Sequence, residues 1–220
     1  FWERGVVELS RNNPRPQILL SEFRLDPDKA PLRTPSGRIE IWSDTIAGFG
    51  YADCPGHPVW MQPLEWRGSA EGSQLVLVAN NPRSRLHSQL DNGEYSRSTK
   101  VAGREPLRLN PRDAAERGIS EGDKVRVSSA RGACLAGAVL SDAVRPGVAQ
   151  LSTGAWLDVH EIEGAGATCV NGNPNILTED RGTSRLAQGP IGQLCLVEVE
   201  KFDHEPPQSR LPEFATMGTP

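Results

Sequence analysis

The sequence lacks several features that would place it in a common class of protein. No apolar run is long enough to cross a bilayer, so the sequence predicts no membrane span. It also lacks an excess of positive charge, because 24 Lys and Arg residues stand against 28 Asp and Glu residues, for a formal net charge of -4. A mildly acidic chain of this kind argues against a nucleic-acid partner.

Cysteine is scarce, and its spacing indicates no metal site. Cys54, Cys134, Cys169 and Cys195 form no CxxC pair or other metal-ligand spacing. A disulfide framework is not expected in a chain of this size. Cys134 and Cys195 lie in apolar, strand-like runs, which predicts buried thiols. The sequence leaves the compartment open, and unpaired thiols favour the cytoplasm over the periplasm.

The N-terminus carries no targeting signal. Phe1–Gly5 lacks an initiating Met, a basic region and an apolar region, so the chain is expected to continue a longer protein. We interpret residues 1–72 as an irregular linker plus the edge of a neighbouring, preceding domain. Within them, Ile39–Trp42 alternates like a strand and Ser43–Gly48 fits one helical turn. Residues 203–220 carry four prolines and are predicted to be a flexible tail.

Glycine and proline, by contrast, are abundant. The 22 glycines and 18 prolines, with a hydrophobic content of 37%, indicate a turn-rich, mainly β protein with one or two short helices. Residues 73–202 are expected to form its compact domain. Apolar or alternating runs predict strands at residues 75–79, 106–109, 124–128, 133–140, 148–151 and 193–200.

One short helix is predicted between the second and third of these strands. Asn110 fits its N-cap, Pro111 fits its first position and Gly118 fits its end. Six or so short strands with tight turns and one helix suit a small closed barrel. An open sandwich is the alternative architecture.

Two polar loops interrupt the strands. Ala79–Leu90 directly follows the first strand, and Gly172–Gly189 precedes the last. Both are rich in amides, hydroxyls and guanidinium groups and have no helical or strand period, as is typical of loops that hold a polar ligand. The pair suggests a ligand with many hydrogen-bonding edges, such as a nucleotide-bearing cofactor.

Several motifs, taken together and in order, resemble a known family. They are NPRSRLHSQL (81–90), LNPRDA (109–114), RGISEGDKVRV (117–127), RPGV (145–148), GAW (154–156), GNPNILT (172–178) and GTSRLAQG (182–189). The set is similar to the C-terminal cofactor-binding domain of molybdopterin oxidoreductases of the dimethyl sulfoxide reductase family. TPSGRIEI (34–41) and DCPGHPVW (53–60) fit the branch of dimethyl sulfoxide, trimethylamine N-oxide and biotin sulfoxide reductases.

This resemblance implies a six-stranded double-psi β-barrel and a molybdenum-dependent reductase of S-oxides or N-oxides. The implied cofactor is bis(molybdopterin guanine dinucleotide) with molybdenum, and it carries the chemistry while the protein binds and orients it. In this branch the metal ligand is a serine from a more N-terminal domain, so no catalytic or metal-ligating residue is assigned here. The chain is then expected to be inactive alone, with the rest of its polypeptide, a small oxide and an unidentified electron donor as partners.

The first loop supplies most of the candidate cofactor-binding residues. Arg85, His87, Ser88 and Gln89 offer the guanidinium, hydroxyl and amide groups that phosphates and pterin edges bind. Asn80 is added because it lies at a strand end. His87 could act as a general acid, but a hydrogen-bonding role near pterin or phosphate is preferred. Composition alone would favour an ordinary surface loop, and the resemblance shifts the interpretation to cofactor contact.

The second loop supplies the remaining candidates. Asn173 and Asn175 carry donors and acceptors that match the mixed edge of guanine or pterin, and Thr178 is grouped with them. Gln188 is predicted to reach the second pterin. The alternative is turn chemistry, since Asn and Gly also build loops that bind nothing.

A second function from another class remains open. The chain could be a stand-alone double-psi barrel that acts as a ligand-binding or assembly module without catalysis, because related barrels occur in AAA ATPase N-domains and in decarboxylases. The sequence does not select among the possible oxide substrates.

Overall fold

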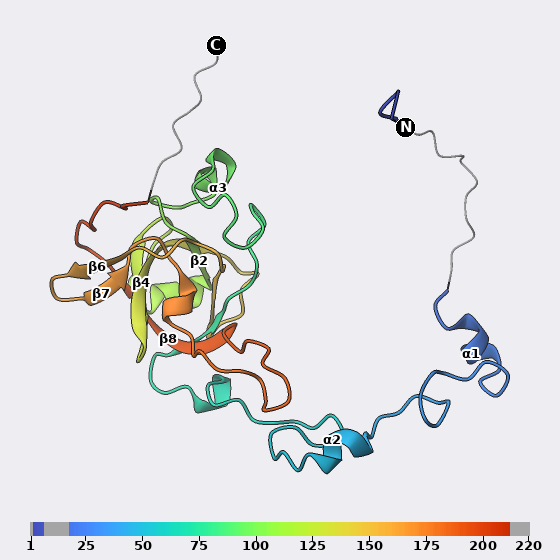
Figure 1. Cartoon of the computed structure of the whole chain (residues 1–220). Helices are drawn as coiled ribbons and strands as arrows, with labels where there is room; N and C mark the ends of the chain where they lie inside the picture. Colours follow the sequence, from blue (N-terminus) through green and yellow to red (C-terminus); the bar gives the residue numbers. More distant parts are fainter. Residues whose placement is uncertain (1, 7–17, 212–220) are drawn as a thin grey trace. The chain divides into compact units, whose positions relative to one another are not determined.

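The computed structural model describes residues 2–6 and 18–211 of the chain. The contacts within the chain group it into two compact units, Phe1–Val59 and Trp60–Pro220, and each is described separately (Figure 1). The part of the predicted tail at residues 212–220 lies outside the described residues.

The described residues of the first unit form two short helices, α1 (Ser21–Leu25) and α2 (Asp44–Gly48). The predicted helical turn is confirmed as α2, because the Ser43 hydroxyl accepts from the Ile46 amide at 3.3 Å and caps the helix. The strand predicted at Ile39–Trp42 is wrong, since these residues form no regular element and Ile39 and Ile41 are exposed. A strand needs a neighbour to accept its backbone bonds, and the described part of this unit offers none.

The second unit is a closed barrel of six strands. They are β1 (Leu75–Val78), β2 (Pro106–Leu109), β3 (Lys124–Ser129), β4 (Gly132–Leu140), β5 (Val148–Leu151) and β8 (Leu194–Lys201). The order β1–β5–β2–β4–β3–β8 closes because β2 pairs with both β5 and β4 and β8 pairs with both β3 and β1. The pairs β1–β5 and β2–β4 are parallel, and the others are antiparallel. The predicted double-psi barrel is confirmed, and the open sandwich is excluded.

The barrel closes around an apolar core because alternate side chains of its short strands point inward. In β2 and β5, for example, every second residue is buried and the residues between are half-exposed. Leu77, Leu107 and Leu151 are fully buried at its centre. The predicted burial of Cys134 and Cys195 is confirmed, and burial raises the pKa of the Cys195 thiol to about 11.

A hairpin that the sequence did not predict extends the sheet outside the barrel. Its strands are β6 (Val159–Ile162) and β7 (Gly166–Cys169), and β7 pairs in parallel with β4. Both strands are short and carry charged or small residues, so their alternation is weak. The sequence also missed the short helices α3 (Glu94–Ser98), η1 (Arg67–Ser69) and η2 (Pro174–Ile176).

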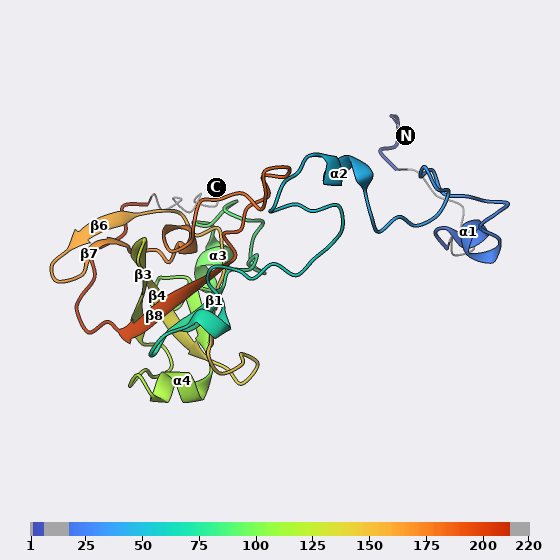
Figure 2. The ribbon, with the colours of Figure 1, turned by 90° about the horizontal axis from the view of Figure 1, so that it is seen from below.

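The predicted helix after β2 is confirmed as α4 (Pro111–Ala115), shorter than expected, at one end of the barrel (Figure 2). Its cap Asn110 has a second role. The side-chain oxygen accepts from the Arg112 amide at 3.0 Å, and the side-chain amide donates to the Val144 carbonyl at 2.8 Å. One residue therefore caps the helix and ties it to the β4–β5 connection.

We expect Asn110→Ala to lower the free energy of unfolding by about 1–2 kcal/mol, because both the cap and the bond to Val144 are lost. Asn110→Ser keeps an oxygen for the cap and should recover about half of this loss. Denaturant unfolding measures both. Equal stability of the Ala variant and the unmodified protein would contradict this role.

Part of the predicted tail is tied to the barrel, and we call residues 203–211 the C-terminal strap. Glu205 pairs with Lys124 at 2.9 Å. The buried carboxylate of Asp158 accepts from the Ser209 hydroxyl at 3.0 Å and from the Arg210 backbone amide at 2.8 Å. The Arg210 guanidinium also bonds Asp158 and the Val159 carbonyl. The strap is thus anchored at its two ends.

The Asp158 anchor should weaken in acid. Burial favours a raised pKa, but the bonds from Arg210 and Ser209 outweigh it and lower the pKa of Asp158 below its usual value of 3.8. The charged carboxylate therefore stabilises the strap above that pH, and the stabilisation is lost as pH falls through the lowered pKa. Relative to the intrinsic exchange rates, hydrogen exchange of the strap should increase as the pH falls below about 4. Asp158→Asn should remove this pH dependence, and exposed Asp142→Asn should keep it.

Candidate functional site

The two polar loops lie at the same end of the barrel, away from α4. Because β1 and β5 are parallel, their carboxyl ends meet at one edge, and the antiparallel strands β8 and β2 begin there. Residues 79–105 join β1 to β2, and residues 170–193 lead into β8. All the predicted cofactor-binding residues are in these two segments, so the fold gathers them at this end.

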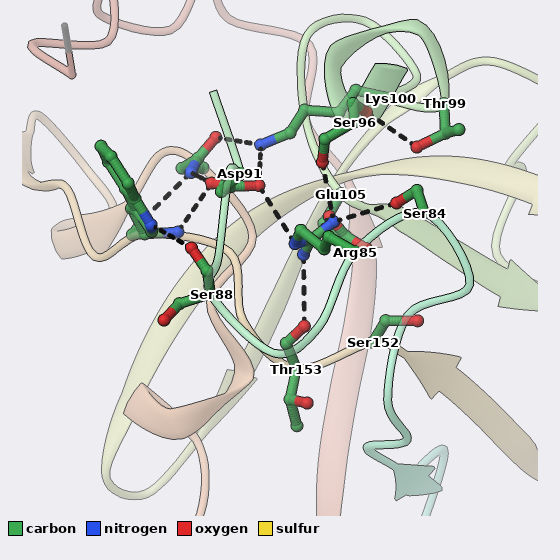
Figure 3. A network of polar contacts seen from close by, with 12 residues as sticks. Ser84, Arg85, Ser88, Asp91, Ser96, Thr99, Lys100, Glu105, Ser152 and Thr153 are labelled. Atoms are coloured by element: carbon green, nitrogen blue, oxygen red, sulfur yellow. Dashed lines mark hydrogen bonds and ion pairs between the residues drawn. The ribbon is translucent and has the colours of Figure 1, made fainter. Parts of the chain in front are cut away.

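Arg85 lies at the centre of a buried network that holds the first loop together (Figure 3). Its side chain is only 1% exposed. Its guanidinium donates to Glu105 Oε2 (3.0 Å), the Ser96 hydroxyl (3.2 Å), the Ser84 hydroxyl (3.4 Å) and the carbonyls of His87 (3.1 Å) and Thr153 (3.2 Å). In this structure Arg85 therefore serves the loop itself, and its predicted contact with a cofactor stays a prediction.

A second buried acid, Asp91, joins the two loops. It accepts from the Asn171 side-chain amide at 2.9 Å and from the Trp156 backbone amide at 2.8 Å, and it pairs with Lys100 at 2.9 Å. Lys100 also donates to Asn171 at 3.0 Å. The network thus links the segment after β1, the segment after β5 and the segment before β8.

The pKa values of the two buried acids, Glu105 and Asp91, are shifted in opposite directions. Burial raises the pKa of Glu105, and the charge of Arg85 only partly offsets this effect. Burial also acts to raise the pKa of Asp91, but the Trp156 amide and Lys100 outweigh it and lower that pKa. The network is therefore anchored on a charged Asp91.

The backbone of the turn at His87–Ser88 is held in place by Arg85, Gly154 and Trp156. His87 has a positive φ of 49°, and its carbonyl accepts from Arg85. Gly154, with φ of 91°, packs directly against the His87 carbonyl, and the Trp156 ring N–H donates to the Ser88 carbonyl at 2.7 Å. The side chains of His87, Ser88 and the following Gln89 are consequently left exposed at the surface.

The candidates of the second loop are placed by turn chemistry. Asn173 is buried, and its side chain accepts from the Asn175 amide at 2.9 Å, which caps η2. Thr178 donates to the Asn175 carbonyl at 3.4 Å, and the exposed Gln188 donates to the Ser184 carbonyl at 2.8 Å. The Asn175 side chain is exposed. Their contacts with a cofactor stay predictions.

A cavity of about 550 Å³ opens beside the first loop and includes Asn80. It is lined by Asn80, Pro82, Arg83, Ser84, Thr99, Glu105, Pro106, Arg108, Gln150 and Ser152. Sequence reasoning missed Arg108, Gln150 and Ser152, because their meeting depends on the register of β2 against β5. A second cavity of about 580 Å³ lies between Lys100, Asn171 and the C-terminal strap.

Across residues 2–6 and 18–211, no group of three or more His, Cys, Asp or Glu side chains could hold a metal ion. In the same ranges no helix is long and apolar enough to cross a membrane.

Residues 75–196, which span most of the barrel and both loops, match the sequence model of the molydopterin dinucleotide binding domain. The chain belongs to this family. The resemblance noted in the sequence is thereby confirmed, including its place as the C-terminal domain of the dimethyl sulfoxide reductase family.

Curated relatives of the domain are similar over nearly its whole length. Trimethylamine-N-oxide reductase 1 of Escherichia coli (strain K12) is 50% identical over 92% of this chain. Dimethyl sulfoxide/trimethylamine N-oxide reductase of Cereibacter sphaeroides is 46% identical over 94%, and biotin sulfoxide reductase of the same organism is 46% identical over 91%. The matches cover 24%, 25% and 26% of those proteins, so this chain spans about a quarter of their length.

A solved structure supports the fold. Acetylene hydratase from Pelobacter acetylenicus superposes with a TM-score of 0.61 at 19% identity, covering 80% of this chain and 25% of that chain. At this identity the likeness concerns the fold alone.

Proposed function

We propose that this domain is the cofactor-binding C-terminal part of a molybdenum-dependent oxidoreductase that reduces S-oxides or N-oxides by oxygen-atom transfer. The observation that carries the proposal is the sequence identity of 46–50% over more than nine-tenths of the chain to three reductases named for such oxides. The proposed cofactor is bis(molybdopterin guanine dinucleotide). When bound, it supplies the redox centre for the transfer, and the protein supplies binding and orientation.

The donor set at the loop end fits such a cofactor. His87, Ser88 and Gln89 present an imidazole, a hydroxyl and an amide on a turn held by Arg85 and Gly154. These groups can donate to phosphate oxygens and can both donate to and accept from a pterin edge. We propose that they contact the cofactor directly, with Asn175, Thr178 and Gln188 approaching it from the second loop.

The remaining candidates are proposed to shape these surfaces. Asn173 fixes η2, which sets the position of Asn175, and Arg85 fixes the turn at His87. Asn80 reaches the cavity at the end of β1. No residue of this chain is proposed as a metal ligand or as a group that reacts with the oxide.

The domain division and the partners are part of the proposal. Residues 1–72 would be a linker and the edge of a preceding domain, residues 73–202 the cofactor-binding barrel, and residues 203–220 a tail of which the C-terminal strap is anchored. The contact boundary after Val59 supports treating residues 1–59 separately, whereas residues 60–72 group with the barrel. The rest of the polypeptide, a small S-oxide or N-oxide and an electron donor would complete the enzyme.

The test is the mass, molybdenum content and oxide reduction of the gene product purified from its source. We expect a mass several times 23.9 kDa, bound molybdenum and guanine nucleotide, and turnover of trimethylamine N-oxide, dimethyl sulfoxide or biotin sulfoxide with a reduced dye as the electron source. A protein near 23.9 kDa without molybdenum or pterin would overturn the proposal. The stand-alone binding module would then be the better interpretation.

A further inference from the structure

A row of polar side chains crosses the outside of the barrel from β2 to the end of β1. Arg108 and Gln150 are direct partners in the β2–β5 pairing, at positions that face away from the core. The Arg108 guanidinium donates to the Gln150 side-chain oxygen at 3.3 Å. The Gln150 amide donates in turn to the side-chain oxygen of Asn80, which also accepts from the Ser152 hydroxyl at 3.5 Å.

The direction of these bonds decides which ligand the row can bind. Both amide oxygens, on Gln150 and Asn80, are occupied as acceptors within the row. A guanidinium has five N–H donors and a primary amide has two, so N–H groups of Arg108 and Gln150 remain for a ligand. Such a row favours a ligand that only accepts hydrogen bonds.

The charges around the cavity favour an anion. Arg83 and Arg108 line it, and neither forms a salt bridge with any residue in 2–6 or 18–211. The lining acid Glu105 is paired with buried Arg85 at 3.0 Å, so its charge is already compensated. The Ser84 hydroxyl also lines the cavity, and because it accepts from Arg85 its own proton remains for a ligand.

We propose that this cavity, which we call the β1–β5 groove, binds the diphosphate of one dinucleotide arm of the cofactor. Arg83 and Arg108 bind phosphate oxygens, and Gln150 donates to the adjoining oxygen. The volume of about 550 Å³ is within the range of small-ligand sites. This inference rests on the proposed function for the identity of the nucleotide, and on the groove alone for the recognition of phosphate.

The test compares two forms of the gene product, Arg83→Gln/Arg108→Gln and the control Arg112→Gln. Arg112 carries the same charge on α4, at the other end of the barrel, and its side chain is 76% exposed. Binding of GDP, inorganic pyrophosphate and guanosine to the cofactor-free protein is measured by calorimetry. We expect the double variant to bind GDP and pyrophosphate at least about 10-fold more weakly than the control, with a smaller salt dependence.

The probes separate the sources of binding. Pyrophosphate binding that is lost in the double variant supports a phosphate site, and weaker binding of guanosine than of GDP supports it further. Equal GDP affinity in the double variant and the control would overturn the proposal. The exposed Arg83→Gln single variant keeps the test valid if the double variant is unstable, and it should weaken GDP binding about threefold or more.

Failure of the groove and failure of the proposed function give different results. If the unmodified protein carries molybdenum and guanine nucleotide, and the double variant keeps both through a high-salt wash, the groove proposal is wrong while the function stands. If the unmodified protein carries neither, but GDP binding is lost in the double variant, the function is wrong while the groove stands.

Discussion

Replacing Arg85 with Met should lower the free energy of unfolding by about 3–5 kcal/mol, which is among the largest effects expected for one substitution in this domain. Met has a similar length but no donors. The change would leave Glu105 buried without its cation and would remove the bonds to the carbonyls of His87 and Thr153. Breaking a buried ion pair by removing one partner is costly because the remaining charge stays desolvated. Thermal or denaturant unfolding measures the loss.

Two matched variants sharpen this result. Arg112→Met removes the same group from the exposed surface and should change stability by less than about 1 kcal/mol. Arg85→Lys keeps the charge but not the planar guanidinium, so its free energy of unfolding should lie between those of Arg85→Met and the unmodified protein. If Arg85→Met and Arg112→Met were equally stable, the buried network would not be what holds the loop.

Replacing Gly154 with Ala should cost about 2–5 kcal/mol and displace the turn at His87–Ser88. The residue has φ of 91°, a conformation that side chains disfavour, and an added Cβ would overlap the His87 carbonyl. The obstacle is backbone on both sides, so no rotamer change relieves it. We expect lower stability, faster hydrogen exchange at residues 86–90 and loss of bound cofactor from the gene product.

Gly164→Ala is the matched control for this prediction. Gly164 lies in the β6–β7 turn with φ of 76°, and an added Cβ would meet nothing within 4 Å. Gly164→Ala therefore has the penalty of a positive φ but no steric overlap, and it should lower the free energy of unfolding by about 1–2 kcal/mol. A cost at Gly154 no greater than that at Gly164 would mean that the contact with His87 does not constrain the loop.

Arg85→Met and Gly154→Ala both disturb the turn at His87–Ser88, through different contacts with its backbone. Arg85 holds the His87 carbonyl by hydrogen bonding, and Gly154 lets the backbone approach it. If the exposed side chains of this turn bind the cofactor, each variant should lose more cofactor for each kcal/mol of lost stability than Asn110→Ala, which weakens α4 at the other end of the barrel. That comparison separates the shape of the loop from the stability of the barrel.

The sequence by itself determined the elements whose causes are local. Each barrel strand shows its own apolar or alternating period, and Asn110 caps α4 through an amide two residues away. These features arise within a few residues, so the pattern of the chain was enough to predict them. The two polar loops were found for the same reason, since their composition breaks every regular period.

The tertiary structure decided what depends on residues far apart in the chain. Arg85 looked like a ligand-binding residue, but its bonds run to Glu105 and Thr153 and leave it buried. The row from Arg108 to Gln150 and Asn80 exists only because the register of β2 and β5 sets those side chains beside each other. Ile39–Trp42 has the period of a strand but pairs with no strand among residues 2–6 and 18–211. A period specifies which way side chains point, whereas pairing and burial require contacts that only the folded chain supplies.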